Sequence, residues 1–161
     1  MTTARRVAPV EPASQRIGSA LVALQFALIV ALAVSAGPAF LHGQAPAGAV
    51  TLAVAAVMFG VWALYANRPG NFNVRPTPRD GGRLVQEGPY RWIRHPMYTA
   101  VIACSLAAAW GGASPWGWLA ATALIAVLAI KALLEERWIL AVHPDYSAYR
   151  ARTRRFIPGL L

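Results

Sequence analysis

The sequence predicts an all-α integral membrane protein: a bundle of about four transmembrane helices, with both termini in the cytoplasm and a short interfacial helix near the C-terminus. Of the 161 residues, 57% are apolar and only 13% are charged, whereas an ordinary soluble domain has roughly 25% charged residues. Charged residues are absent from residues 17–66 and 96–130, and the basic residues flank these two stretches. The high apolar content excludes a disordered tail, and the net charge of +9 excludes an acidic binding protein. A disulfide scaffold is excluded because the single Cys104 cannot pair within the chain.

Each uncharged stretch divides into two apolar runs. Residues 17–40 and 49–66 are separated by the segment LHGQAPAG, and residues 96–110 and 116–134 are separated by GGASP. About 20 helical residues, at roughly 1.5 Å each, cross the hydrocarbon of a bilayer. We therefore expect one transmembrane helix from each run, the third being the shortest.

A single domain is expected over residues 17–161, because a chain of this length forms about one domain. Residues 1–16 are rich in Pro, Ala and Thr, and we expect them to form a disordered lead-in. Arg5 and Arg6 before the first apolar run imitate a signal peptide, but that run is longer than the usual apolar core of about 7 to 15 residues. The first helix is therefore expected to be retained.

The basic residues define the expected orientation. All 15 lie before the first apolar run, between the second and third runs, or from the end of the fourth run onward. The two opposite loops, near His42 and Ser114, carry none, so the positive-inside rule places the termini and the long middle loop in the cytoplasm. Attraction to anionic lipid explains basic charge in these places, so we expect the bilayer, and not nucleic acid, as a partner. A bacterial inner membrane is the expected location, because the chain is compact, rich in Ala and Arg, and without accessory domains.

Rows of small residues at four-residue spacing predict close packing between helices, since such rows let helix backbones approach in lipid. The rows are Ala23, Ala27, Ala31 and Ser35; Ala100, Cys104, Ala108 and Gly112; and the pair Ala56 and Gly60. Cys104 is accordingly interpreted as a packing residue and not as a nucleophile.

The polar segments on the cytoplasmic side hold nearly all the ionisable groups, so a site is expected there. In the first of them, Pro96 suits the first turn of the third helix, where its missing N–H is not needed. His95 then stands at a helix entry, where free N–H groups attract anions, and Arg91 and Arg94 add donors. The alternative is that both arginines contact lipid phosphates and that His95 only caps the helix.

A pair of carboxylates, Glu135 and Glu136, ends the fourth apolar run. Carboxylates at the edge of the hydrocarbon are costly and are default candidates for a functional site. The alternative is an internal ion pair between Lys131 and Glu135, which are four residues apart. Neighbouring helix residues point about 100° apart, so one Glu can face the bundle while the other faces water or Arg137.

A short helix is expected after Pro144 and Asp145, with Tyr146 and Tyr149 on one face. An amphipathic helix at the membrane interface explains this pattern without any ligand.

Five short motifs together carry a family resemblance. They are Gly88-Pro89-Tyr90, Arg94-His95-Pro96-Met97-Tyr98, Glu135-Glu136, the pair Tyr146 and Tyr149, and the ending Arg154-Arg155-Phe156-Ile157-Pro158. In this order and spacing they resemble the isoprenylcysteine carboxyl methyltransferase family and its relatives, the phospholipid methyltransferases, over residues 68–161. The helices before residue 68 match only as apolar spans.

The resemblance implies a cytosolic pocket for S-adenosylmethionine, built from residues 67–98 and 131–161. The cofactor-binding residues that it implies are Tyr90, His95, Pro96, Tyr98, Glu135 and Glu136. Their chemistry agrees, because aromatic faces and carboxylates suit a sulfonium, an ammonium and a ribose diol, while His or Arg suits a carboxylate. One departure is Ala100, where the family often has glycine; its methyl group is expected to tighten that helix contact.

We therefore expect a membrane methyltransferase that acts on a lipophilic acceptor. A carboxylate acceptor is favoured, because arginines that can hold it outnumber the possible bases near the site. The candidate catalytic residues are Arg94, Arg137 and Glu136, and the candidate substrate-binding residues are Arg91 and Trp138. No metal is expected.

Three alternatives stay open. A phospholipid amine N-methyltransferase would need a base to take a proton from its acceptor. A sterol-type membrane reductase would use NADPH, whose 2′-phosphate the arginines could hold. A non-catalytic membrane scaffold would keep the fold alone. The sequence leaves the acceptor, the methylated atom and the oligomeric state open.

Overall fold

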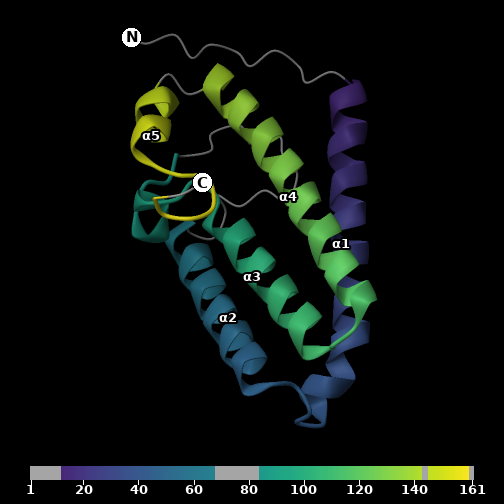
Figure 1. Cartoon of the computed structure of the whole chain (residues 1–161). Helices are drawn as coiled ribbons and strands as arrows, with labels where there is room; N and C mark the ends of the chain where they lie inside the picture. The colour runs from purple at the N-terminus through teal and green to yellow at the C-terminus, as the bar shows by residue number, and fades with distance from the viewer. Residues whose placement is uncertain (1–11, 68–83, 143–144, 160–161) are drawn as a thin grey trace, which may run out of the picture.

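The computed structural model describes residues 12–67, 84–142 and 145–159 (Figure 1). Its elements, in chain order, are α1 (Pro12–Leu41), α2 (Ala47–Asn67), the 3₁₀ turn η1 (Gly88–Arg91), α3 (Pro96–Gly111), α4 (Pro115–Val142) and α5 (Tyr146–Arg152). In these ranges, pairing of the β type is limited to an isolated parallel bridge between Ile93 and Arg154. The predicted all-helical fold is confirmed.

Three helices in the described ranges are long and apolar enough to span a membrane: Gln15–Leu41, Ala47–Asn67 and Pro115–Ala141. The remaining apolar helix, α3, has 16 residues. The protein is thus a membrane helical bundle whose third apolar helix is short, as the sequence predicts.

Two helix ends differ from the prediction. α1 begins at Pro12, so residues 12–16, expected in the disordered lead-in, are helical. α4 continues to Val142 instead of ending near Leu134, because Glu and Arg are good helix formers and neither Pro nor Gly follows until Pro144. The carboxylate pair therefore lies inside a continuous helix, about two turns before its end.

Parts of three expectations lie outside the described residues. These are the lead-in before residue 12, residues 68–83 of the expected pocket, and the turn at residues 143–144.

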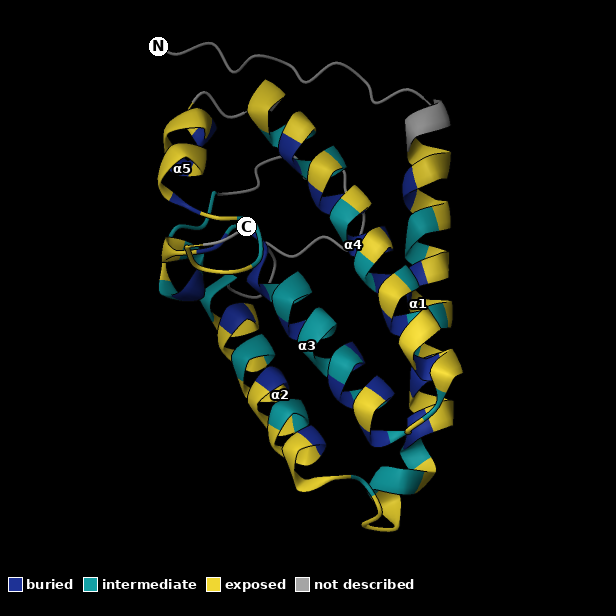
Figure 2. Ribbon diagram, in the orientation of Figure 1, coloured by how far each residue is buried: buried dark blue, intermediate teal, exposed yellow. Residues whose placement is uncertain are grey.

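Helix α3 occupies the centre of the bundle and contacts α1, α2 and α4, while α1 also packs along α4 (Figure 1). The loops that join α1 to α2 and α3 to α4 lie at one end of the bundle. The turn η1 and helix α5 lie at the other end, where α3 begins and α4 finishes. The outward faces of α1 and α2 are largely exposed (Figure 2), and their exposed side chains are mostly apolar, as helices in contact with lipid require.

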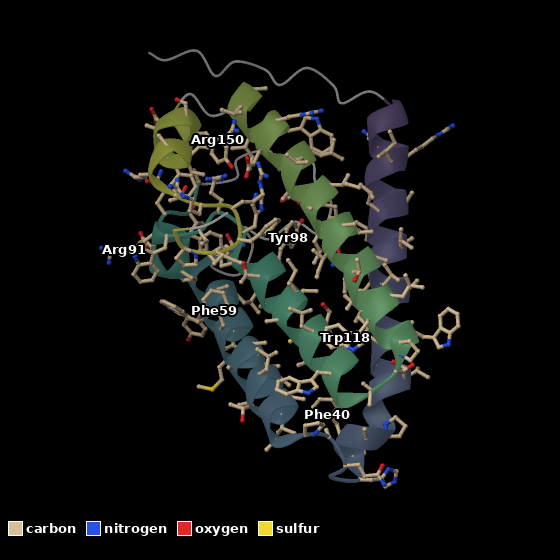
Figure 3. All side chains as sticks on the ribbon, viewed as in Figure 1. Phe40, Phe59, Arg91, Tyr98, Trp118 and Arg150 are labelled. Carbon is tan, nitrogen blue, oxygen red and sulfur yellow. The ribbon has the colours of Figure 1, made fainter. Side chains whose placement is uncertain are left out.

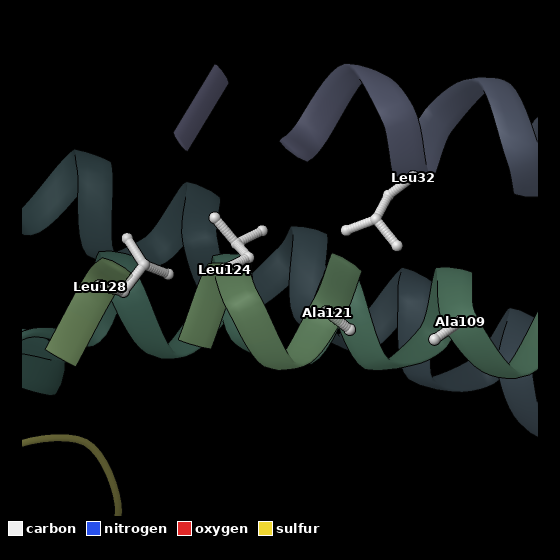
Figure 4. Packing of buried hydrophobic residues seen from close by; sticks show 5 residues of the cluster. All are labelled: Leu32, Ala109, Ala121, Leu124 and Leu128. Atoms are coloured by element: carbon white, nitrogen blue, oxygen red, sulfur yellow. The ribbon is translucent and has the colours of Figure 1, made fainter. Parts of the chain in front are cut away.

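The bundle centre is built from few large side chains. Leu32 of α1, Ala109 of α3 and three residues of α4, namely Ala121, Leu124 and Leu128, form one buried cluster (Figure 4). Lipid tails are as apolar as leucine, so this contact is stabilised by close packing and not by the hydrophobic effect.

Small residues permit close approach at the contact between α2 and α3, as predicted. A Cβ added to Gly60 would lie 3.1 Å from the Cβ of Ala100. At the far end of α3, a Cβ added to Gly112 would lie 3.3 Å from the Cβ of Ala36 on α1. The methyl group of Ala100 therefore faces α2.

The prediction for the row of small residues on α1 is wrong. Ala23, Ala27, Ala31 and Ser35 are all exposed on the outer face of the helix. The face that packs inside the bundle carries Gln25, Leu32 and Ala36, which recur at the seven- and four-residue spacings of one helix face. A row of small residues does not by itself say which face of a helix is packed.

Candidate active site

The site is assembled by backbone pairing between two segments that are far apart in the sequence. The N–H of Arg94 donates to the carbonyl of Arg154 at 2.7 Å, and the N–H of Arg154 donates to the carbonyl of Trp92 at 2.9 Å. The N–H of His95 donates to the carbonyl of Arg155 at 3.1 Å. The C-terminal segment is thereby fixed against the entry to α3.

A close approach of η1 to α2 fixes the other side of this entry. Gly88 has a φ of +56°, and a Cβ there would lie only 2.8 Å from the Cβ of Ala66. Glycine tolerates both the positive φ and the contact. The 3₁₀ turn ends at Arg91, and α3 begins at Pro96 after a short connection.

Glu136 is the centre of an ionic cluster. Arg94 Nε donates to Glu136 Oε1 at 2.9 Å, and Arg155 donates to both carboxylate oxygens, from Nε at 3.0 Å and from Nη2 at 3.1 Å. The Nε atom of Arg150 is 3.8 Å from Glu136 Oε2. Glu136 is 3% exposed, and a buried carboxylate needs such charged hydrogen bonds to offset its lost hydration.

Arg94 also binds the backbone at the end of α5. Its Nη1 donates to the carbonyl of Thr153 at 2.5 Å and to the carbonyl of Arg150 at 3.3 Å. The same guanidinium therefore binds Glu136 of α4 and two carbonyls, one in the last turn of α5 and one directly after it. These bonds fix its orientation.

His95 bridges the two carboxylates. Its Nδ1 is 3.4 Å from Glu135 Oε2, and its Nε2 is 3.3 Å from Glu136 Oε1. Burial alone would lower the pKa of His95, but the hydrogen bonds to Glu135 and then Glu136 outweigh it, so that the pKa is raised. A protonated imidazole, which donates from both ring nitrogens, suits this position.

Tyr98 completes the inner side of the cluster. Its hydroxyl donates to Glu135 Oε1, and its ring is stacked on the imidazole of His95, with centroids 5.4 Å apart. Figure 3 shows Tyr98 at the start of α3, on the side toward α4. One turn deeper in α4, Lys131 places its Nζ 5.2 Å from the centroid of the same ring.

Helix α5 turns its tyrosines inward. Tyr146 and Tyr149 are both buried, and the hydroxyl of Tyr149 donates to the carbonyl of Tyr90 in η1 at 2.8 Å. Burial, the largest cause, raises the pKa of Tyr149 to about 12, although Arg94 and Arg152 oppose the shift. The shared face predicted for the two tyrosines thus packs on the site, and the exposed face of α5 carries Arg150 and Arg152.

The structure brings together most of the residues singled out from the sequence. Arg94, His95, Tyr98, Glu135 and Glu136 form one connected cluster. Tyr90 is half-buried beside α5, and Pro96 is buried at the start of α3.

Three candidates lie at the margin of the cluster. The guanidinium of Arg91 is exposed and lies 5.8 Å from the ring centroid of Trp92. Arg137 is exposed on α4, and Trp138 beside it is half-buried. Arg137 follows Glu136 directly, so its side chain points about 100° away from that of Glu136.

Several residues that the fold places in or beside the cluster are not among the predicted site residues, although the sequence analysis names Lys131 as a possible ion-pair partner of Glu135. They are Gln25, Lys131, Arg150, Thr153 and Arg155. The basic ending that contains Arg155 was part of the family resemblance, and this was the available signal for it. For Gln25 the available signal is a polar amide within the first apolar run, since polar side chains in such segments face the bundle interior.

The charged end of this membrane bundle carries one cluster of carboxylates, aromatic rings and arginines that are hydrogen-bonded to a carboxylate. The protein therefore belongs to the class of integral membrane proteins that have a polar site near the bilayer surface. The profile of the phospholipid methyltransferase family matches residues 45–145, and the chain belongs to this family. Membership implies a membrane methyltransferase. The match includes α2, which precedes the region of the resemblance noted from the sequence, and it ends before α5.

The chain is also similar to the cobalt-zinc-cadmium resistance protein CzcN of Cupriavidus metallidurans. It is 33% identical over 87 residues, which are 51% of this chain and 38% of the relative. The aligned region thus spans well under half of that protein. Within residues 12–67, 84–142 and 145–159, no three His, Cys, Asp or Glu side chains are grouped so that they could hold a metal ion.

Proposed function

We propose that the protein is an S-adenosylmethionine-dependent methyltransferase that modifies a lipophilic acceptor at the cytosolic face of a membrane, for which a bacterial inner membrane is the expected setting. The observation that carries the proposal is the cluster of His95, Tyr98, Glu135 and Glu136 at the charged end of a membrane bundle. Membership of the phospholipid methyltransferase family supports the reaction class. The basic residues of the described segments near this end support the cytosolic side.

The donor set fits the proposed cofactor. S-adenosylmethionine supplies an activated methyl group on a sulfonium, and its other charged groups are an ammonium and a carboxylate. Glu135 is the carboxylate best suited to a cationic group, because its side chain is 18% exposed whereas that of Glu136 is 4% exposed and held by arginines. The rings of Tyr98 and His95 suit the sulfonium and the adenosine, and Tyr90 and Pro96 would line the same entry to α3.

Within this proposal Glu136 and Arg94 act by positioning. Arg94 and Arg155 neutralise Glu136 and hold the C-terminal segment, so Glu136 keeps His95 in place beside Glu135. Methyl transfer is an in-line displacement, and the fixed relative placement of the two reactants supplies much of its acceleration. A rigid, fully bonded cluster next to the bilayer suits this requirement.

The acceptor is proposed as a lipid-soluble molecule with a carboxylate or an amine at its polar end. A carboxylate would need a cation, and the candidates among the described residues are the exposed Arg91 and Arg137. Trp138 would lie beside the acyl chain. Arg94 is bound to Glu136 and to two backbone carbonyls, so it is a weaker candidate for binding the acceptor carboxylate. An amine would need a base, and Glu135 is the best placed one.

The first test is ligand binding by the purified protein in detergent. A ligand present at about 100 times its Kd stabilises a folded protein by about 2.7 kcal/mol. We expect S-adenosylmethionine and S-adenosylhomocysteine to raise the melting temperature, and His95→Ala to abolish this shift. A shift with NADPH alone would instead support a sterol-type reductase, and no shift with any of them would support a non-catalytic scaffold.

The second test distinguishes the acceptors. Methyl-labelled S-adenosylmethionine is incubated with the protein and a membrane lipid extract, and the labelled lipid is then treated with mild base. A methyl ester releases its label as volatile methanol, whereas an N-methyl group stays bound to nitrogen in the non-volatile amine headgroup.

A further inference from the structure

A buried polar pair joins α1 to α4 below the ionic cluster. The Nζ of Lys131 donates to Oε1 of Gln25 at 2.6 Å, and the two residues are 1% and 8% exposed. Both lie inside segments long and apolar enough to span the membrane. Polar and charged groups in such segments are costly and face the bundle interior where they serve a function.

The pair reaches the site through Tyr98. The ammonium of Lys131 lies 5.2 Å from the Tyr98 ring centroid, within the range of a cation–π contact. The hydroxyl of the same tyrosine donates to Glu135. Lys131 and Glu135 are four residues apart on α4, so they lie on one face of that helix.

Tyr98 is therefore held by contacts of different kinds. His95 stacks on its ring with an interplanar angle of 5°, Lys131 lies over the ring, and Glu135 accepts from its hydroxyl. The position of the Lys131 ammonium is in turn fixed by Gln25. A change at Gln25 can thus reach Glu135 through two intervening side chains.

We propose that Gln25 and Lys131 are positioning residues of the cofactor site, which fix the Tyr98 ring and through it the carboxylate of Glu135. This rests on the proposed function, since the ligand in question is S-adenosylmethionine. It makes α1 part of the site, although the family match begins at residue 45 and so excludes that helix. Neither residue is proposed to touch the cofactor.

The test compares Gln25→Leu and Lys131→Met with the wild type in lipid nanodiscs. The Kd for S-adenosylmethionine is measured by calorimetry at a temperature well below every melting temperature. We expect each variant to raise the Kd about tenfold, and the double variant to raise it by no more than one of them alone, because residues in one network are not additive. Lys131→Arg keeps a cation near the ring and is expected to retain most of the affinity.

A matched control separates positioning from stability. Leu32→Ala removes a buried side chain at the same interface between α1 and α4. Tyr98 packs against the hydrophobic cluster that contains Leu32, but Leu32 is a hydrocarbon side chain and takes no part in the polar contacts of Gln25, Lys131 and Tyr98. We expect it to lower the melting temperature and to leave the Kd unchanged. If Lys131→Met does not fold, Gln25→Leu and Lys131→Arg carry the comparison.

The outcomes are distinguishable. If the wild type binds S-adenosylmethionine and the Kd is unchanged in Gln25→Leu and Lys131→Met, this inference is overturned and the proposed function stands. A Kd that rises as much in Leu32→Ala also overturns it, since loosening of the interface then explains the effect. A wild-type protein that binds no S-adenosylmethionine overturns the proposed function, and the inference with it.

Discussion

Arg155 holds Glu136 in a two-point grip, with Nε donating to Oε1 at 3.0 Å and Nη2 donating to Oε2 at 3.1 Å. The two residues belong to different elements, since Glu136 lies in α4 and Arg155 follows α5. The backbone carbonyl of Arg155 also accepts from the N–H of His95. One residue of the C-terminal segment therefore connects α4 to the entry of α3.

Loss of this bidentate contact between Arg155 and Glu136 should destabilise the packing of the C-terminal segment against α4. We expect Arg155→Met to lower the free energy of unfolding by about 1.5–3 kcal/mol, the range for hydrogen bonds to charged groups. Arg155→Lys should recover only part of it, because lysine cannot make the two-point contact. Unfolding of the detergent-solubilised protein measures both changes. Equal stability of Arg155→Met and the wild type would show that the grip contributes nothing.

The two neighbouring glutamates should differ in what their loss affects. Glu136→Gln leaves Arg94 and Arg155 around a neutral amide, and breaking a buried ion pair costs about 3–5 kcal/mol. Glu135→Gln removes a carboxylate whose contacts include Tyr98 and His95, and we expect a smaller loss of stability with a larger loss of S-adenosylmethionine affinity. Melting temperature and Kd are measured on both variants. The prediction is contradicted if Glu135→Gln is the less stable variant.

How far the sequence predicts this fold depends on the kind of signal. The four apolar runs became helices because apolar content and helix length are local properties, and the extension of α4 past Glu136 follows from local propensity as well. The buried face of α1 was not predictable in the same way. Gln25 and Leu32 face inward because they meet Lys131 and Leu124 of α4, and these contacts cross about 100 residues of sequence.

The residues of the candidate site also differ in whether a local signal in the sequence predicts them. His95, Tyr98 and Glu135 were found through short motifs that recur in a family. Arg155 and Thr153 act on the site through contacts with Arg94, His95 and Glu136 that exist only after the C-terminal segment has folded back. Tertiary contacts of this type leave no periodic pattern in the chain.

The raised pKa of His95 makes stability depend on pH. Because burial is outweighed by the hydrogen bonds to Glu135 and Glu136, the folded protein holds the His95 proton more tightly than the unfolded chain does. The contribution is complete below the unfolded pKa of about 6.5 and is lost as the pH rises through the higher folded value. We expect the melting temperature difference between wild type and His95→Gln to be largest at low pH and to shrink above about pH 6.5. A melting temperature difference that stays constant as the pH rises from below to above about 6.5 would contradict a raised pKa of His95 in the folded protein.

Gly88 provides a prediction about the entry to the site. In Gly88→Ala the added Cβ meets the Cβ of Ala66 at 2.8 Å, at a positive φ that alanine adopts only with strain. We expect a loss of about 1–3 kcal/mol in the free energy of unfolding, and weaker S-adenosylmethionine binding, because displacement of η1 moves Tyr90 and the residues that lead to His95. Gly37→Ala on α1 is the matched control, since nothing lies within 4 Å of its added Cβ and alanine favours the helix. Equal effects of the two substitutions on stability and binding would mean that the contact between η1 and α2 does not position the site.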